Sequence, residues 1–322
     1  MYAIEAIELA KNFGQVRAVN GINFQVNEGE VFGFLGPNGA GKTTTIRMLT
    51  GQVKPSGGMA KIFGHDIQTD TYEAKRNMGI VPEHSNVYDD LSAWDNIMFT
   101  AELYQVPKAR REKRAMELLE LFGLSGRRKG KIKGFSKGMK RRLTIAMGLI
   151  NDPKILFLDE PTAGLDVQSS LLIKDVIREL IKNGVTIFLT THNIEEANIW
   201  CDRVAIIQKG RILTTDTPEA LKKTTQSVQS VEVAFSNSFA NGALELLKEL
   251  QKIPTVSEVT KEGDKFRLYT AEPPTVLSSL YEFSMLKGLN ILNVNTLGPS
   301  LEDVFVRLTG IKIRPEEGNS NE

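Results

Sequence analysis

The sequence has little cysteine, little net charge and no long apolar run. Cys201 is the one cysteine among 322 residues, so no internal disulfide can form, which fits a reducing compartment. Because it stands in "IWCDRVAII", beside a strand-like run, we expect a buried small apolar side chain rather than a reactive thiol. The formal net charge of +1 gives no bias toward nucleic acid, so we expect no nucleic-acid partner.

Signals for crossing a membrane are also lacking. No uninterrupted apolar run approaches the roughly 20 residues that span a bilayer. The amino terminus, "MYAIEAIELAKNFG", is acidic and broken early, so we expect no secretory signal. A role at a membrane would therefore require a partner protein.

The first two-thirds of the chain alternates strand-like and helix-like segments. The apolar runs at residues 30–36, 154–161 and 185–192 predict buried strands, and residues 42–51 predict a helix that ends at glycine. This alternation is typical of an α/β fold with a mainly parallel sheet covered on both faces.

The central segment is helical. We place a helical subdomain at about residues 84–152, with helical periodicity from residue 92 to about 123. Ser92 with Asp95 three residues later is close to a capping box. One apolar helix face is expected to be core, and it comprises Ala115, Leu118, Leu119 and Phe122.

A second domain follows a polar connector. We assign residues 1–222 to the first domain, 223–310 to a small C-terminal α+β domain, and 311–322 to a disordered tail. The C-terminal domain is expected to have the order βαββαβ. Its elements are predicted at residues 228–235, 240–250, two strands within 255–270, 275–286 and 290–296, and a last helix is predicted to start at Ser300.

The stretch "GPNGAGKT" matches the phosphate-binding pattern G-x-x-x-x-G-K-[ST] between a predicted strand and a predicted helix. Backbone N–H groups and the helix N-terminus would cradle phosphates, Lys42 would reach the β- and γ-phosphates, and Thr43 would ligate Mg²⁺. Thr44 would add a hydroxyl and an amide near the α/β region. The expected loop residues are Gly36, Pro37, Asn38, Gly39, Ala40, Gly41, Lys42 and Thr43.

Two further segments complete a candidate nucleotide site. Phe13, with Val19 six residues later, precedes the phosphate loop and would stack on a base, although a core phenylalanine is the alternative. "LFLDE" delivers Asp159 as a Mg²⁺ ligand and Glu160 toward an attacking water. His192 ends the next strand and would contact the γ-phosphate; a structural histidine is the alternative.

The stretch "GFSKGMKRR", residues 134–142, has the composition of an anion site. Nine Lys and Arg and no acid stand between residues 127 and 142. On composition alone, a solvated helix–loop face is the more ordinary interpretation. A complete phosphate loop already lies upstream, so the sequence raises the question of whose phosphate this stretch would bind.

Taken in order, the phosphate loop, "FSKGM", "LFLDE", "AGLD" and "TTH" resemble the P-loop NTPase nucleotide-binding domain of an ABC ATPase over about residues 1–222. The resemblance implies ATP and Mg²⁺ as cofactors, and a homodimer or paired ABC ATPase that packs head to tail. Ser136 and Gly138 would then contact the ATP of the second copy, and Asp166 would cross the same interface.

Two positions depart from the family pattern. The signature has Phe135, Lys137 and Met139 where L-S-G-G-Q is usual, and Glu83 stands where a Mg²⁺-ligating glutamine is usual. Glu83 can also ligate Mg²⁺, but it adds negative charge. The resemblance further implies a groove after Glu83 for a helix of a membrane subunit, with packed core as the alternative. The groove candidates are Val87, Tyr88, Leu91, Trp94 and Ile97.

"GIVPEHSNVYDDLSAWDNI" and "SLEDVFVRLTG" resemble the ATPase subunits of drug-resistance and ABC-2-type exporters. This resemblance implies integral membrane permease subunits as partners, and a peripheral location on the cytoplasmic side of the membrane. A soluble ABC ATPase, such as the iron–sulfur assembly type, is the alternative. A P-loop kinase is a third class, against which the signature loop argues.

Overall fold

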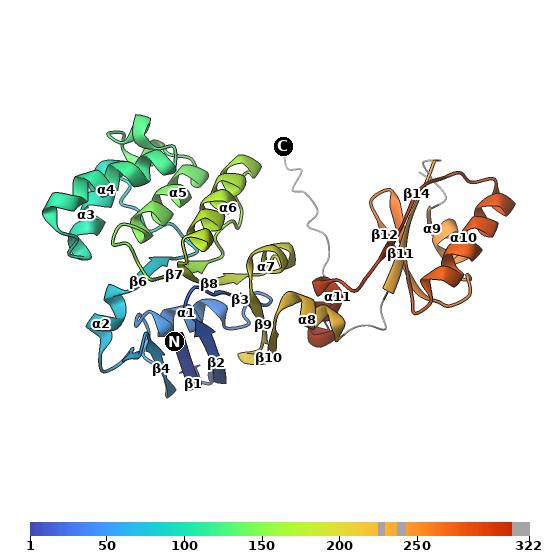
Figure 1. The fold of residues 1–322 in the computed structure, drawn as a ribbon, viewed down its shortest axis with the longest axis horizontal. Coiled ribbons are helices and arrows are strands. Elements are labelled where there is room, and N and C mark those ends of the chain that lie inside the picture. The colour runs from blue at the N-terminus through green and yellow to red at the C-terminus, as the bar shows by residue number, and fades with distance from the viewer. Residues whose placement is uncertain (225–228, 237–242, 311–322) are drawn as a thin grey trace. The chain divides into compact units, whose positions relative to one another are not determined.

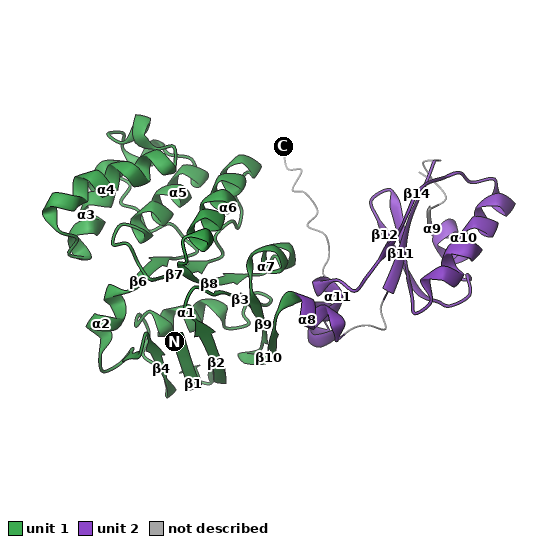
Figure 2. Ribbon diagram, in the orientation of Figure 1, with its two compact units in different colours: residues 1–218 green, residues 219–322 purple. Residues whose placement is uncertain are grey.

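The computed structural model describes residues 1–224, 229–236 and 243–310. The chain divides into two compact units, Met1–Pro218 and Glu219–Glu322 (Figure 2). This division falls after Pro218, whereas the sequence analysis placed the boundary after Lys222. The predicted disordered tail, residues 311–322, lies outside the described residues.

A mainly parallel sheet forms the middle of the first unit (Figure 1). Its strand order is β10-β9-β3-β8-β7-β6, in which β10 alone among the pairs described runs antiparallel to its neighbour. The strands are β3 (Val31–Leu35), β6 (Met78–Val81), β7 (Ile155–Asp159), β8 (Thr186–Thr191), β9 (Arg203–Gln208) and β10 (Arg211–Asp216). Every residue of β3, β7 and β8 is buried, which confirms the three predicted strands.

A second, antiparallel sheet was not predicted. Its order is β2-β1-β4-β5, and its strands are β1 (Tyr2–Phe13), β2 (Val16–Asn27), β4 (Gly57–Ile62) and β5 (His65–Asp66). The two sheets share a core in which Phe24 of β2 packs on Phe34 of β3 with ring centroids 5.1 Å apart. Helix α1 (Lys42–Leu49), predicted at residues 42–51, contacts β2, β4 and β7, so it is enclosed by strands of both sheets.

Helices α3 (Ala93–Leu103), α4 (Lys108–Leu121), α5 (Lys137–Gly148) and α6 (Val167–Lys182) gather on the side of the parallel sheet opposite β1, β2 and β4 (Figure 1). Ser92 caps the first of them through the predicted capping box with Asp95. The predicted core face of residues 115–122 is buried. Cys201 is buried as expected, and burial raises the pKa of its thiol. The unit also has α2 (Thr71–Arg76), which contacts β5, α7 (Ile194–Trp200), and short 3-10 turns at Ser125–Arg127 and Ile132–Gly134.

The second unit has the predicted βαββαβ order. Its antiparallel sheet runs β12-β13-β11-β14, and an apolar core that includes Val231, Phe266 and Leu280 joins the sheet to the helices. The last helix follows Ser300 as predicted. The elements are α8 (Pro218–Lys223), which begins at the unit boundary, β11 (Gln229–Phe235), α9 (Ala243–Leu250), β12 (Val256–Glu262), β13 (Lys265–Thr270), α10 (Pro273–Lys287), β14 (Ile291–Leu297) and α11 (Leu301–Thr309).

No helix within the described ranges combines the length and the apolar character that a bilayer span requires.

Candidate functional site

The phosphate loop joins β3 to α1 and packs tightly against neighbouring backbone. A Cβ on Gly36 would lie 2.3 Å from the carbonyl oxygen of Ile207, and one on Gly41 would lie 2.5 Å from that of Ala18. Gly41 also has a φ of 107°, a conformation that only glycine adopts without strain. The two glycines are therefore fixed by close approach and backbone shape.

The start of α1 offers backbone donors to an anion. Gly41 occupies the N-cap without a side-chain capping bond, and the N–H of Thr45 is the first that bonds back along the helix, to the carbonyl of Gly41 at 2.9 Å. The N–H groups from Lys42 to Thr44 have no acceptor within the helix, because the first turn always lacks them. A phosphate fits this position by both hydrogen bonding and helix dipole.

Lys42 lies inside the loop and is buried. Its Nζ donates to the carbonyl of Gly36 at 2.7 Å and to that of Pro37 at 3.3 Å, and it forms an ion pair with Glu160 Oε1 at 3.1 Å. The ammonium is therefore held at the point where the loop meets the carboxyl end of β7.

Asp159, the last residue of β7, is buried and accepts two hydroxyl hydrogen bonds. Thr190 donates to its Oδ1 at 2.5 Å and Thr43 at 3.2 Å. Burial raises the pKa of Asp159 above its usual range, and the hydrogen bonds from Thr190 and Thr43 only partly offset this effect.

The donors near Asp159 fit Mg²⁺. A carboxylate and a hydroxyl are the hard oxygen ligands that this ion prefers. Within the described residues, no group of three or more His, Cys, Asp or Glu could hold a metal ion by itself. Mg²⁺ usually binds through one or two carboxylates together with phosphate oxygens and water.

Glu160 lies between two cationic or polar partners. Its Oε2 is 2.8 Å from His192 Nδ1 and accepts from the backbone N–H of His192 at 3.3 Å, while Oε1 pairs with Lys42. Burial alone would raise the pKa of Glu160, but the hydrogen bond from His192 and the charge of Lys42 outweigh burial and lower it. The result is an ionised carboxylate that can accept a hydrogen bond from a water molecule.

Two supporting groups were missed by the sequence analysis. Thr190 bonds Asp159, and its backbone carbonyl also accepts from the N–H of Glu160 at 3.1 Å. Glu196, in the first turn of α7, accepts from Thr162 and from Thr191 at 3.2 Å, and its burial raises its pKa. The second acid of "NIEEA" was the available signal for Glu196, but nothing in the sequence distinguishes it from a helix-capping charge.

The two residues proposed to hold a base differ in exposure. Phe13, at the end of β1, is 51% exposed, so the alternative of a core phenylalanine is wrong. Lys11 Nζ lies 5.0 Å from its ring centroid. Val19 is fully buried in the core, against the position that a Cβ on Gly41 would occupy. Its side chain therefore supports the phosphate loop and has no exposed surface to offer a base.

Ser136, Gly138 and Asp166 form a second cluster where α5 meets α6. Ser136 caps α5 and accepts from the N–H of Met139 at 3.2 Å, and Asp166 caps α6 and accepts from the N–H of Ser169 at 2.8 Å. A Cβ on Gly138 would lie 2.1 Å from Ser169 Oγ, so the two helix starts touch. Within the described residues, no hydrogen bond or ion pair joins this cluster to the phosphate loop of the same chain.

Glu83 is exposed in the segment after β6. Its negative charge contributes to the raised pKa of Asp159, behind burial and against the hydrogen bonds that lower it. The structure therefore brings Glu83 into the electrostatic neighbourhood of Asp159, without a direct bond between the two side chains among those described.

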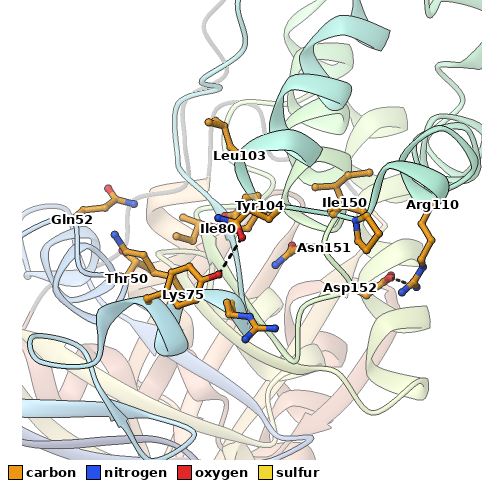
Figure 3. Close-up of a pocket in the computed structure, with 15 residues that line it drawn as sticks. Thr50, Gln52, Lys75, Ile80, Leu103, Tyr104, Arg110, Ile150, Asn151 and Asp152 are labelled. Carbon is orange, nitrogen blue, oxygen red and sulfur yellow. Dashed lines mark hydrogen bonds and ion pairs between the residues drawn. The ribbon is translucent and has the colours of Figure 1, made fainter.

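The five groove candidates differ in exposure. Ile97 is fully buried, whereas Tyr88 and Leu91 are exposed and Val87 and Trp94 are half-buried. A cleft of about 590 Å³ lies beside the ends of α1, α2 and α3, and none of the five candidates lines it, whereas Trp94 lines a different pocket. Figure 3 shows the cleft, whose lining includes Thr50, Ile80, Leu103, Tyr104, Ile150 and Asp152.

Known proteins resemble this chain in sequence. Residues 19–163 match the family model described as "ABC transporter". The chain is 35% identical to the linearmycin resistance ATP-binding protein LnrL of Bacillus subtilis, over 97% of this chain and 99% of that protein. It is 37% identical to the Nod factor export ATP-binding protein I of Rhizobium sp., over 96% and 97%, and 35% identical to the daunorubicin/doxorubicin resistance ATP-binding protein DrrA of Streptomyces peucetius, over 99% and 95%.

Solved structures agree as well. The ATP binding subunit of an ABC transporter superposes with a TM-score of 0.64 at 28% identity, over 69% of this chain and 92% of that one. The ATP-binding cassette MJ0796, in a dimeric post-hydrolysis state bound to ADP and Pi, superposes with a TM-score of 0.61 at 25% identity, over 66% and 98%.

Proposed function

We propose that two copies of this chain, which belongs to the ABC transporter family and is an ATP-binding, ATP-hydrolysing subunit, close head to tail over two ATP molecules. One observation carries the chemical part of the proposal. Thr43 donates to Asp159, and Glu160 contacts both Lys42 and His192. These contacts lie where the phosphate loop meets the ends of β7 and β8.

The chain's own residues bind and orient the nucleotide. The N–H groups at the start of α1 and the ammonium of Lys42 bind the β- and γ-phosphates, and Phe13 offers an exposed ring to the base. Thr43 and Asp159 would hold Mg²⁺, which when bound would neutralise phosphate charge. Glu83, whose negative charge acts on Asp159, is the proposed further ligand.

Glu160 acts on water. Its lowered pKa keeps it ionised at neutral pH, so its carboxylate accepts a hydrogen bond from the attacking water and orients it toward the γ-phosphate. His192 fixes the orientation of that carboxylate through its Nδ1 and presents the rest of a half-exposed ring to the phosphate.

The second cluster completes the site of the other copy. Ser136 and Asp166 are exposed, and they lie at the N-termini of α5 and α6, which attract an anion. We assign Ser136 and Gly138 to the γ-phosphate of the second copy's ATP, and Asp166 to the same interface. This assignment answers the question raised by the stretch that carries Ser136 and Gly138, since the phosphate that these two residues contact belongs to the neighbour.

We further propose that the pair drives export through integral membrane subunits, at the cytoplasmic side of the membrane. Two of the relatives are named for resistance and one for Nod factor export. The cleft beside α1, α2 and α3 is the proposed seat for a short helix of the membrane subunit, because Leu103 and Ile80 give it an apolar wall with polar residues around it. The C-terminal βαββαβ unit is proposed as an accessory domain.

Purification from detergent-extracted membranes tests the coupling to a membrane subunit. The parental chain should retain an integral membrane protein. Leu103→Asp should lose most of it, because Leu103 is 65% exposed and lines the cleft. Leu171→Asp is the matched control on α6, is similarly exposed and should retain the partner. Absence of any membrane partner with the parental chain, or equal retention by Leu103→Asp, would contradict the coupling.

A further inference from the structure

Arg141 is a buried cation in α5, 3% exposed, that the site described above does not use. An arginine side chain has five N–H groups in a planar fork, and here each of them meets a backbone carbonyl. Nε donates to Pro161 at 3.0 Å, Nη1 to Pro82 and to Glu83 at 3.0 Å, and Nη2 to Asp159 at 2.7 Å and to Glu160 at 3.0 Å.

Three of these carbonyls belong to consecutive residues, 159–161, where the chain leaves β7. Glu160, in the middle, has a φ of 48°, a left-handed conformation that a residue with a side chain rarely adopts. The bend turns the carboxylate of Glu160 toward Lys42 and His192. The fork of Arg141 therefore holds the backbone shape on which the direction of that carboxylate depends.

The other two carbonyls belong to Pro82 and Glu83, directly after β6. Arg141 itself lies one turn beyond the Ser136 cap in α5. One side chain thus connects three segments: the helix that carries Ser136, the bend that carries Glu160, and the strand end that carries Glu83.

The chemistry of the fork makes this connection specific to arginine. A lysine ammonium is a compact point charge with three donors, so it cannot meet five carbonyls that lie on three segments. Burial lowers the pKa of Arg141, and the charges of Asp159, Glu83 and Glu160 oppose this effect. The resulting pKa is about 10, so the group stays charged at neutral pH.

We infer that Arg141 is a positioning residue for ATP hydrolysis, which sets the carboxylate of Glu160 and the Glu83 segment relative to the α5 end that contacts the second copy's ATP. The inference rests on the proposed role of Glu160. The N–H groups of Arg141 all donate to backbone carbonyls outside the phosphate loop, so its loss should slow turnover and leave nucleotide binding by Lys42 and the phosphate loop intact.

The test compares the purified parental chain with Arg141→Lys, Arg141→Gln, Glu160→Gln and the matched control Arg142→Lys. Arg142 is the adjacent arginine of the same helix, and its Nη1 donates to one carbonyl, that of Phe122, at 3.0 Å. Each protein is measured for kcat, KM, affinity for a fluorescent ATP analogue and thermal unfolding. Misplacing a catalytic group by about 1 Å costs on the order of 100-fold in rate, so Arg141→Lys should lose about 10- to 100-fold in kcat.

The pattern of constants decides the outcome. The inference predicts that KM and analogue affinity of Arg141→Lys stay within about twofold of the parent while kcat falls, and that Arg142→Lys keeps the parental kcat. A folded Arg141→Lys with parental kcat would overturn it, as would a loss of affinity equal to the loss of kcat. If Arg141→Lys does not fold, the same criteria for kcat, KM and affinity apply to Arg141→Gln. Failure of both to fold where Arg142→Lys does would assign Arg141 to the fold rather than to the reaction.

Glu160→Gln distinguishes a failure of the Arg141 inference from a failure of the proposed role of Glu160, on which that inference rests. If Glu160→Gln hydrolyses ATP at the parental rate, the proposed role of Glu160 fails whatever Arg141 does. If Glu160→Gln is inactive and Arg141→Lys is fully active, only the positioning role of Arg141 fails.

Discussion

Replacing Glu160 by glutamine keeps the size of the side chain and removes its charge. In the structure this carboxylate is 8% exposed, 3.1 Å from Lys42 Nζ and 2.8 Å from His192 Nδ1. A positioned proton acceptor contributes about 10²- to 10⁴-fold to a rate. At about 1.4 kcal/mol per tenfold, Glu160→Gln should raise the barrier to hydrolysis by about 3–6 kcal/mol.

The same change should not weaken ATP binding. Phosphate oxygens must share the ammonium of Lys42 with Glu160, and glutamine removes that competing charge. Lys42 keeps its bonds to the carbonyls of Gly36 and Pro37, at 2.7 and 3.3 Å, so the loop keeps its shape. Affinity should therefore equal or exceed that of the parent, and the unhydrolysed ATP should accumulate a dimer.

Three measurements on one preparation check this prediction. Phosphate release gives the rate, a fluorescent ATP analogue gives monomer affinity, and sedimentation with ATP gives the dimer. Glu195→Gln, which alters an exposed acid in the first turn of α7, is the control and should behave as the parent does. Hydrolysis by Glu160→Gln at the parental rate, or loss of its ATP binding, would refute the reasoning.

Further predictions concern the two clusters. Ser136→Arg should block turnover while monomer ATP affinity stays within about twofold, since the loop serves the second copy; loss of monomer binding in a nucleotide titration would place Ser136 in its own chain's pocket. Thr190→Val removes a hydrogen bond that lowers the pKa of Asp159, so the acid limb of the kcat/KM profile should move to higher pH, and an unmoved limb would exclude Asp159 as its source. Gly138→Ala places a Cβ 2.1 Å from Ser169 Oγ and should cost about 1–3 kcal/mol in urea unfolding and reduce turnover; parental values in both assays would contradict the tight junction.

The parallel strands were predictable because their signal is local. Strands β3, β7 and β8 are short apolar runs that end in glycine, acids or histidine, and each is buried throughout. The antiparallel sheet of β1, β2 and β4 was not predicted, because the long strands β1 and β2 mix apolar and charged residues and contain register shifts where alternation breaks. Its place is set by packing of Phe24 against the parallel sheet, which sequence spacing does not reveal.

The residues of the site also divide into those that the sequence predicts and those that it does not. The phosphate loop, Asp159 and Glu160 were predicted because each combines a strand end with a characteristic neighbour. Thr190 and Glu196 were missed because the partners that give them a role lie 31 and 34 residues away along the chain. The left-handed backbone of Glu160 could not be predicted either, since no glycine marks it and a guanidinium from α5 supports it.

A cross-link between two differently tagged chains tests most directly the claim that each copy completes the other's site. One chain carries Ser136→Cys and the other Asn38→Cys, both exposed positions, in the Glu160→Gln background; the native Cys201 is buried. With ATP and a short bifunctional thiol reagent, the account predicts a product that contains one chain of each tag, absent without ATP and absent from either chain alone. No product between the two chains when ATP is bound would contradict it. In a further variant that carries both cysteines on one chain, a cross-link formed within that chain would contradict it too.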